Sequence, residues 1–385
     1  MTKGRDGSYL LEILSWTLSF PEINNEPLTL IFLFSPFKIH GKARMLRKIQ
    51  ILLGIFFVFA FGILYEFSHN PGCLFSCLPI SKKFPTFKGV MSQGNSIIFL
   101  ETTDRLDPPP LVSCSVESTA RIYHDRPIVF FMKGLKSNIR WHPKNTSTAF
   151  SLLSAIKNVF IVPLQMETLL QKTPLLSWYH KVNETLEKNW IHISSDASRL
   201  AIIWKYGGLY MDTDIISIRP IPVKTFIAAQ ASKVASNGIF SFPRHHSFIW
   251  NCMKNFVENY NADIWGHQGP YLMTRVLKTL CNLTDFKAVE DQCYQNIFFL
   301  NPQRFYPIPY PLWEKYYEVW DLHTNFSDSY FSDSYALHLW NYMNQQQKAV
   351  VAGSNTLAEN LYKTYCPITY KNLILDRHRG GCKRE

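Results

Sequence analysis

The sequence predicts an α/β domain with a mostly parallel central sheet, and three observations support this class. Continuous apolar runs recur at residues 97–100, 128–132 and 159–162, as expected for strands that are buried on both faces. Stretches that suit helices, at residues 111–123 and about 166–181, alternate with these runs, and such alternation favours parallel strands. A further short strand, residues 208–211, ends directly before a pair of aspartates, and ligands bind beyond the carboxyl ends of strands in such sheets.

The composition is that of a globular chain with a large core. Of its 385 residues, 46% are hydrophobic and 18% are charged, which excludes a disordered protein. The formal net charge of +11 would suit nucleic acid or an acidic membrane as a partner. No basic helix or nucleic-acid motif accompanies that charge, so we predict a solvated basic surface and no nucleic-acid partner.

One segment, residues 49–67, is predicted to span a membrane. Its centre, residues 51–65, carries no charge, and four basic residues precede it directly, so the positive-inside rule places residues 1–48 in the cytosol. The alternative is a cleaved signal peptide, but no small-x-small cleavage site follows, which favours an uncleaved signal anchor. Residues 1–44 look like an extension, because Met45 begins a basic stretch that leads straight into the apolar run.

The remaining chain is then predicted to be lumenal. Residues 68–94, with several prolines and lysines, are expected to form a stem, residues 95–375 the folded domain, and residues 376–385 a basic tail. Four N-glycosylation sequons, all after the anchor, agree with this topology; they begin at Asn145, Asn183, Asn282 and Asn325. Eight cysteines in an oxidising compartment suggest disulfides whose pairing the sequence leaves open, and without a CxxC pair no zinc site is expected.

The most informative motif is Gly207-Gly208-Leu-Tyr-Met-Asp212-Thr-Asp214. It places two carboxylates at the tip of a strand, and such hard anionic oxygens suit a divalent cation such as Mn²⁺ or Mg²⁺. A cation there can neutralise a diphosphate. An ordinary strand-to-loop turn explains Asp-x-Asp equally well when the motif stands alone.

A helix is predicted immediately before this motif. Ser194 or Ser195 is a suitable N-cap and Gly207 a suitable stop, so Asp196 and Arg199 would lie side by side in the first turns. This acid and base can bind the hydroxyls of a sugar, or they can form a structural salt bridge that caps the helix. The neighbouring aspartates favour the sugar site.

Taken together, these segments resemble the DxD-containing glycosyltransferases of the GT-A fold that form glycosyltransferase family 32. The resemblance rests on residues 97–102, 111–118, 194–222, 265–270 and 335–341. It covers about residues 95–370, and the first 44 residues lie outside it. It implies a nucleotide-sugar-binding domain with a mostly parallel sheet, preceded by a single transmembrane helix.

The resemblance also implies roles for individual residues. Asp212 and Asp214 would hold Mn²⁺ against the diphosphate of UDP, and His338 would contact the metal or the diphosphate as a third ligand. The residues expected to bind substrate are Asp196 and Arg199 at the donor sugar, Glu101 and Thr102 near the uridine, and also Tyr210 and Trp340.

Two residues near a helix expected to begin at Pro270 are candidates for the reaction centre. Gln268 would lie beneath the reacting anomeric carbon, although an amide is a poor nucleophile, and Asp263 is the nearby carboxylate. A same-face substitution, in which the leaving diphosphate helps to deprotonate the acceptor, suits such a site better than double displacement. Trp265, Trp313 and Trp340 are expected either to form a platform for an acceptor galactose or to pack in the core.

The activity that the resemblance implies is a retaining transfer of N-acetylglucosamine from UDP-GlcNAc to a terminal β-galactose of mucin-type O-glycans, in α-1,4 linkage. The enzyme would be a type II protein of the Golgi membrane. The nearest alternative is an α-1,4-galactosyltransferase that acts on a glycolipid. More distant alternatives are a phosphatase that uses Asp-x-Asp, whose motif normally ends the first strand of its domain, and a lumenal lectin-like module.

Overall fold

The computed structural model describes residues 53–54, 87–135, 147–281, 291–294, 296–320 and 331–375. Within these residues no helix is both long and apolar enough to cross a membrane. The predicted anchor, apart from residues 53–54, lies outside them, as do residues 1–48, the basic tail 376–385 and three of the sequons. The chain divides into two compact units, residues 1–78 and 79–385, and the fold described below belongs to the second.

An eight-stranded sheet forms the centre of the domain, in the order β3-β2-β1-β4-β7-β6-β9-β8. β1 pairs in parallel with β2 and β4, and β2 with β3. β7 is antiparallel to both of its neighbours, whereas β6 and β9 are again parallel to each other. The expected mostly parallel sheet is therefore confirmed. Its strands are β1 (Ile97–Glu101), β2 (Ile128–Met132), β3 (Val159–Pro163), β4 (Gly208–Met211), β6 (Phe226–Ala231), β7 (Val234–Phe242), β8 (Gln292–Tyr294) and β9 (Ile297–Leu300).

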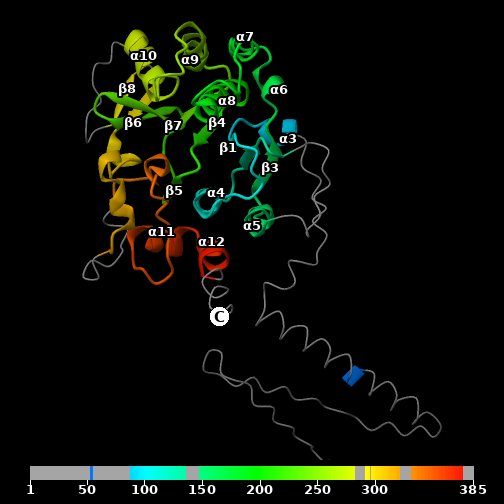
Figure 1. The fold of residues 1–385 in the computed structure, drawn as a ribbon, viewed down its shortest axis with the longest axis vertical. Coiled ribbons are helices and arrows are strands. Elements are labelled where there is room, and N and C mark those ends of the chain that lie inside the picture. Colours follow the sequence, from blue (N-terminus) through cyan, green and yellow to red (C-terminus); the bar gives the residue numbers. More distant parts are fainter. Residues whose placement is uncertain are drawn as a thin grey trace, which may run out of the picture. The chain divides into compact units, whose positions relative to one another are not determined.

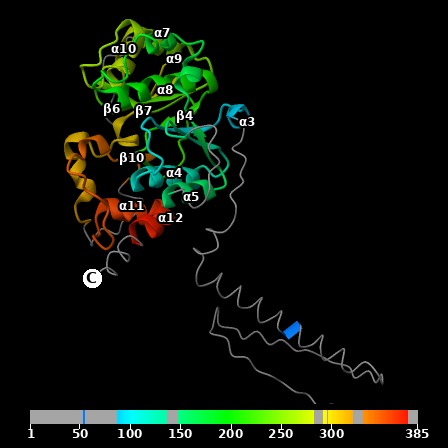
Figure 2. The same cartoon turned by 45° about the vertical axis from the view of Figure 1, so that its right-hand side comes forward.

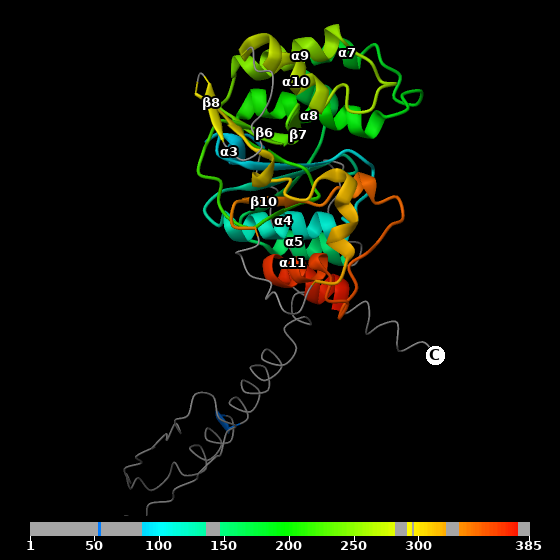
Figure 3. The ribbon, with the colours of Figure 1, turned by 90° about the vertical axis from the view of Figure 1, so that its left-hand side faces the viewer.

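Helices cover both faces of this sheet (Figure 3). One face packs against α8 (Trp190–Tyr206), α9 (Ser247–Glu258) and α10 (Pro270–Cys281), and the other against α4 (Pro110–Ile122) and α5 (Thr148–Ala155). Successive residues of β1 alternate between the two cores, with Ile98 in the first and Phe99 in the second, because side chains of a strand point to opposite faces. This two-sided burial is the reason that the strands read as continuous apolar runs.

Two boundaries differ from the sequence predictions. The helix expected over about 166–181 is two short helices, α6 (Met166–Leu170) and α7 (Leu175–Tyr179), separated by a turn that contains Pro174, a residue disfavoured inside helices. The folded domain also begins within the predicted stem, because α3 (Phe87–Met91) places Met91, only 1% exposed, in the core.

The C-terminal part of the described chain forms a layer of short elements. It contains α11 (Leu357–Tyr365), α12 (Pro367–Thr369), the π-helical η5 (Tyr370–Leu375) and the 3₁₀ helices η2 (Pro302–Arg304), η3 (Tyr310–Tyr317) and η4 (Asn341–Met343). Of these, α11 and α12 lie below α4 in Figures 1 and 2. The strand β10 (Ala336–His338) of this layer pairs antiparallel with β5 (Ile215–Ser217). A disulfide joins Cys114 of α4 to Cys366 before α12. The C-terminal layer therefore packs against β5, the strand that follows the Asp-x-Asp motif, and is linked covalently to α4.

Candidate active site

Two glycines bring the chain from α8 into β4. Gly207 (φ +68°) ends the helix as predicted, and Gly208 (φ +107°) lies so close to the neighbouring strand that a Cβ would be 2.4 Å from the carbonyl oxygen of Ser96. Only glycine combines this conformation with this approach. β4 then ends at Met211, and the N–H of Asp212 donates to the carbonyl of Gly238 at 2.8 Å.

Asp212 is held from two sides by side chains that come before it in the sequence. Its Oδ1 lies 2.9 Å from Nη1 of Arg199 and accepts a 2.6 Å hydrogen bond from the Tyr210 hydroxyl. The guanidinium of Arg199 also lies over the Tyr210 ring, 4.5 Å from its centroid. Oδ1 is therefore fully engaged, and Oδ2 is the oxygen left to bind a ligand.

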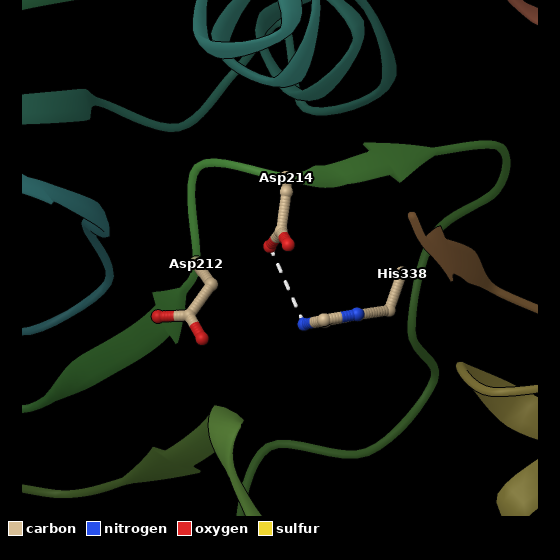
Figure 4. A group of neighbouring side chains, drawn as sticks. All are labelled: Asp212, Asp214 and His338. Carbon is tan, nitrogen blue, oxygen red and sulfur yellow. Dashed lines mark ion pairs between the residues drawn. The ribbon is translucent and has the colours of Figure 1, made fainter. Parts of the chain in front are cut away.

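Asp214 meets His338 because of strand pairing. β10 places His338 opposite Ile215, the residue after Asp214, and Nε2 of His338 lies 3.3 Å from Oδ1 of Asp214 (Figure 4). The other carboxylate oxygen, Oδ2, accepts the N–H of Asn341 at 2.9 Å. Residues more than 120 positions apart in the sequence, as Asp214 and His338 are, thus share one site.

The proton position on His338 follows from its neighbours. The N–H of Trp340 points at Nδ1, 3.1 Å away, so a neutral ring carries its proton on Nε2 and donates it toward Asp214. Binding of a cation through Nε2 requires the other tautomer and the loss of the Trp340 contact. In the arrangement present here, His338 serves as a hydrogen-bond donor.

Asp212, Asp214 and His338 nevertheless form a set that fits a divalent cation. One ligand atom from each lies within 4.8 Å of the others, and two carboxylate oxygens with an imidazole suit Mn²⁺ or Mg²⁺. Burial raises the pKa of Asp212, Arg199 opposes this, and the adjacent Asp214 raises it further. A cation would relieve the cost of placing two carboxylates together, and the two aspartates would provide its principal ligands.

Arg199 and Asp196 lie together on α8, as predicted. Arg199 Nη2 is 3.4 Å from Oδ1 of Asp196, and both side chains are nearly buried. Burial raises the pKa of Asp196 to about 6, although Arg199 acts in the opposite direction. With Asp212 and Asp214, the site holds three carboxylates and one guanidinium, so two negative charges remain uncompensated when all three acids are ionised.

The predicted start of this helix was wrong. α8 begins at Trp190, not at Ser194 or Ser195, and its N-cap residue Asn189 makes no side-chain capping bond. The serines instead serve inside the helix, where Oγ of Ser195 accepts from Nη2 of Arg199 at 2.8 Å. Ser195 thus orients the arginine, whereas Oγ of Ser194 donates to the carbonyl of Ile191 within the helix.

Sequence reasoning missed the strand that forms the floor of the site. In β7, Asn237 donates from Nδ2 to Asp196 at 2.6 Å, and its carbonyl accepts from Nη1 of Arg199 at 2.8 Å. The next residue, Gly238, lies against Asp212, and Oγ of Ser236 hydrogen-bonds the buried Tyr306 hydroxyl. No local motif marks these residues; only the antiparallel pairing of β7 with β4 brings them here.

Glu101 and Thr102 lie at the carboxyl end of β1, as expected. Thr102 lines a small pocket with Lys133 and Leu164, the residues that directly follow β2 and β3. The Thr102 hydroxyl already donates to the carbonyl of Ile191 at 2.8 Å. Glu101 accepts the N–H of Thr103 and pairs with an arginine. The pocket occupies the edge of the sheet at which ligands bind in parallel α/β folds.

The two residues proposed for the reaction centre are placed differently from each other. Gln268 is buried, with Nε2 donating to the carbonyl of Phe256 at 2.7 Å and Oε1 accepting the N–H of Asn261 at 3.3 Å. Both amide atoms are thus engaged with backbone, which makes Gln268 an anchor of its loop. Asp263 is exposed on the same loop.

The three tryptophans considered for the acceptor platform differ in their surroundings. Trp340 donates from Nε1 to the carbonyl of Ile308 at 2.7 Å and packs on His338, with 4.5 Å between ring centroids. Trp313 is buried at 8% exposure, whereas Trp265 is 42% exposed. Trp340 and Trp313 therefore belong to the framework, and Trp265 is the one open to solvent.

Of the four sequons, only that of Asn183 lies in the described residues. Asn183 is exposed, and its Oδ1 accepts hydrogen bonds from both the N–H and the hydroxyl of Thr185. The asparagine is thus accessible on the surface.

Comparisons with known proteins agree with this geometry. Residues 109–233 match the glycosyltransferase sugar-binding region containing the DXD motif, and residues 241–373 match the alpha 1,4-glycosyltransferase conserved region. Human alpha-1,4-N-acetylglucosaminyltransferase is 56% identical over 330 residues, which cover 86% of this chain and 95% of that protein. Rat lactosylceramide 4-alpha-galactosyltransferase is 38% identical over 77% of this chain and 81% of its own length.

Among solved structures, the galactosyltransferase LgtC aligns over 72% of this chain and 99% of its own, with 11% identity and a TM-score of 0.34. This structural likeness adds nothing to the sequence identities above. The two matched regions contain the Asp-x-Asp motif and His338, respectively. On the strength of those identities, the chain is a glycosyltransferase and belongs to the α-1,4-glycosyltransferase family.

Proposed function

We propose that this enzyme transfers N-acetylglucosamine from UDP-GlcNAc to a terminal β-galactose, forming an α-1,4 linkage with retention of configuration. The choice of donor is supported by the 56% identity to the human N-acetylglucosaminyltransferase, against 38% to the rat galactosyltransferase. Mucin-type O-glycans as acceptors, Mn²⁺ as the cation and a type II orientation in the Golgi membrane complete the proposal.

The observation that carries the proposal is the convergence of Asp212, Asp214 and His338 at the carboxyl end of β4. Their excess negative charge suits a divalent cation, which would supply positive charge against the diphosphate of the leaving UDP. Glu101 and Thr102, at the carboxyl end of β1, mark the edge of the sheet at which the uridine would bind.

The residues of the chain divide the remaining work. Tyr210 and Arg199 hold Oδ1 of Asp212, so that Oδ2 faces the ligand. Asp196, fixed by Asn237, offers carboxylate oxygen to hydroxyl groups of the donor sugar. His338, with its proton on Nε2, can donate to a phosphate oxygen.

In the transfer, the acceptor hydroxyl oxygen forms a bond to C1 of the donor sugar while the bond from C1 to the UDP oxygen breaks. The electron pair leaves with the diphosphate, and the acceptor proton passes to a phosphate oxygen on the same face. This same-face course needs no protein nucleophile, in agreement with a Gln268 amide whose two polar atoms are already bonded.

The decisive experiment incubates the purified full-length chain with Mn²⁺, a panel of UDP-sugars and a galactose-terminated acceptor. We expect transfer from UDP-GlcNAc and an α-1,4 linkage by NMR of the product. Transfer from UDP-galactose alone would replace the proposal with the α-1,4-galactosyltransferase alternative, and the absence of transfer from every UDP-sugar would contradict both.

Asp214→Asn tests the cation site in the same assay. We expect near-complete loss of transfer with an unchanged thermal melt, because one ligand of the cation is removed. Asp333→Asn is the matched control, since the Asp333 side chain is 80% exposed and pairs only loosely with Arg304 at 3.9 Å. Full activity of Asp214→Asn would remove the cation from the mechanism.

A further inference from the structure

Trp265, Tyr342 and His192 form an exposed aromatic cluster. The rings of Trp265 and Tyr342 stack in parallel, with centroids 3.8 Å apart and an interplanar angle of 10°. His192 contacts both rings edge to face, at 4.6 and 5.3 Å between centroids. Although they form a tight contact, Trp265 remains 42% exposed and Tyr342 47% exposed.

Each member of the cluster comes from a segment that also touches a carboxylate of the site. Tyr342 directly follows Asn341, whose N–H donates to Asp214. His192 lies four residues before Asp196 on α8, one helical turn away. The cluster is therefore held at the border of the site by the same backbone that positions Asp214 and Asp196.

The loop that carries Trp265 provides the third connection. It ends at Gly269, where a Cβ would be only 3.0 Å from Oδ2 of Asp196, so the loop packs directly on the site. The electrostatic environment of His192 agrees with this proximity: partial burial and Arg199 lower the pKa of His192, and Asp214 acts in the opposite direction. Charges of the site thus reach the aromatic cluster.

Two exposed isoleucines are the sequence neighbours of cluster residues. Ile191 precedes His192 and is 50% exposed, and Ile264 precedes Trp265 and is 51% exposed. Exposed aromatic side chains next to a charged site mark places where ligands bind. A sugar ring fits such a place because it has an apolar face of C–H groups and hydroxyls around its edge, and aromatic rings favour contact with apolar faces.

We propose that the Trp265–Tyr342 pair binds the acceptor sugar, a galactose-terminated glycan, by contact with its C–H face. This inference rests on the proposed function, since it assigns the acceptor side of the same site. Because the two rings stack on each other, each offers at most its outer face, and the acceptor binds there with its hydroxyls directed toward the donor beside Asp214. His192 acts as a positioning residue that holds the pair from the edge.

The test compares Trp265→Ala, Trp265→Phe and Phe298→Ala in steady-state kinetics with the full-length chain, Mn²⁺, UDP-GlcNAc and a galactose-terminated disaccharide. We expect Trp265→Ala to raise the KM for the acceptor about tenfold, from the loss of one aromatic contact, and to change the KM for the donor less than about twofold. Trp265→Phe should recover most of the loss. Phe298, 36% exposed on β9, is the matched exposed aromatic, and its replacement should leave both KM values unchanged.

An unchanged acceptor KM in Trp265→Ala, or an equal rise in both KM values, would overturn the proposal. Saturation-transfer NMR of the disaccharide with the Mg²⁺–UDP form of the chain, which is diamagnetic, provides a second measurement that needs no transfer. Signal that disappears in Trp265→Ala supports the acceptor site even where UDP-GlcNAc is not the donor. Signal that persists in Trp265→Ala contradicts it whatever the donor.

Discussion

Gly238 lies where the floor of the site meets the Asp212 carboxylate. A Cβ added at this position would be 2.8 Å from Oδ2 of Asp212 and 3.3 Å from the Tyr306 hydroxyl. The carboxylate cannot retreat easily, because Arg199 and Tyr210 hold its other oxygen. The absence of a side chain at Gly238 is therefore part of the geometry of the proposed cation site.

Gly238→Ala should push the Asp212 carboxylate out of position. We expect transfer activity to fall about 100-fold, the scale of loss for a small displacement of a catalytic group, and the Mn²⁺ concentration for half-maximal activity to rise. Both quantities come from a metal titration of the initial rate. An alanine variant with wild-type activity and metal dependence would show that Asp212 has more room than this structure provides.

Asp196 gives the site a pH dependence. Its pKa is raised to about 6, primarily by burial, so the ionised carboxylate that binds sugar hydroxyls develops as the pH rises through about 6. We expect kcat/KM for the donor to increase with pH across that range and then to level off. Because the folded-state pKa lies above the value in the unfolded chain, the same ionisation lowers the stability of the fold as the pH rises from about 4 to 6.

Asp196→Asn is the variant that isolates this effect. It should lower kcat/KM for the donor at neutral pH. It should also remove the rise of kcat/KM near pH 6, since the amide does not titrate. Stability measured by chemical unfolding should likewise lose its dependence on this group between pH 4 and 6. If kcat/KM of the variant still rises through pH 6, another residue is responsible for the pH dependence.

At the scale of elements, α11 is tied to the loop before it by one buried glutamate. Glu359, in the first turn of α11, accepts the N–H groups of Gly353 and Asn355 and the Tyr370 hydroxyl. Lys363 lies 3.0 Å from the same carboxylate, whose side chain is 0% exposed. Burial by itself would raise the pKa of Glu359, but these hydrogen bonds outweigh it and lower the pKa to about 2.

Glu359→Gln should destabilise the domain by about 2–3 kcal/mol at neutral pH, the scale of hydrogen bonds to a charged group. Because the folded-state pKa lies below that of the unfolded chain, this contribution is present above about pH 4.5 and is lost as the pH falls toward 2. Urea unfolding at several pH values measures it, with exposed Glu258→Gln of α9 as the control. Equal stability of variant and wild type at pH 7 would contradict this account.

At the scale of the whole domain, the disulfide between Cys114 and Cys366 joins residues 252 positions apart. It connects α4, next to the Asp-x-Asp segment, to the C-terminal layer that supplies His338. A crosslink over so long a segment restricts the unfolded chain strongly. The disulfide thereby ties the part of the site next to α4 to the C-terminal layer that carries His338.

Cys366→Ser should lower the free energy of unfolding by about 4 kcal/mol. The double variant Cys114→Ser/Cys366→Ser should be no less stable than the single one, because one bond accounts for both losses. Unfolding by guanidinium measures the two variants side by side. A double variant much less stable than the single would mean that Cys114 contributes by another contact.

Local patterns in the sequence determined a large part of this protein. Apolar runs predicted β1, β2 and β3 because these strands are buried on both faces, and the Asp-x-Asp motif predicted a cation site because its residues are adjacent in the chain. Asp196 and Arg199 were found for the same reason: helical spacing places them side by side.

Only the tertiary structure decided the rest. Asn237, Gly238 and Tyr306 carry no local signal, and they reach the site through the pairing of β7 with β4 and the packing of the C-terminal layer. Ser194 and Ser195 were wrongly predicted to cap α8, because a capping serine and one inside the helix that binds an arginine, such as Ser195, look alike in sequence. Adjacency along a chain can be read directly, whereas contacts made by strand pairing depend on distant residues that no local pattern records.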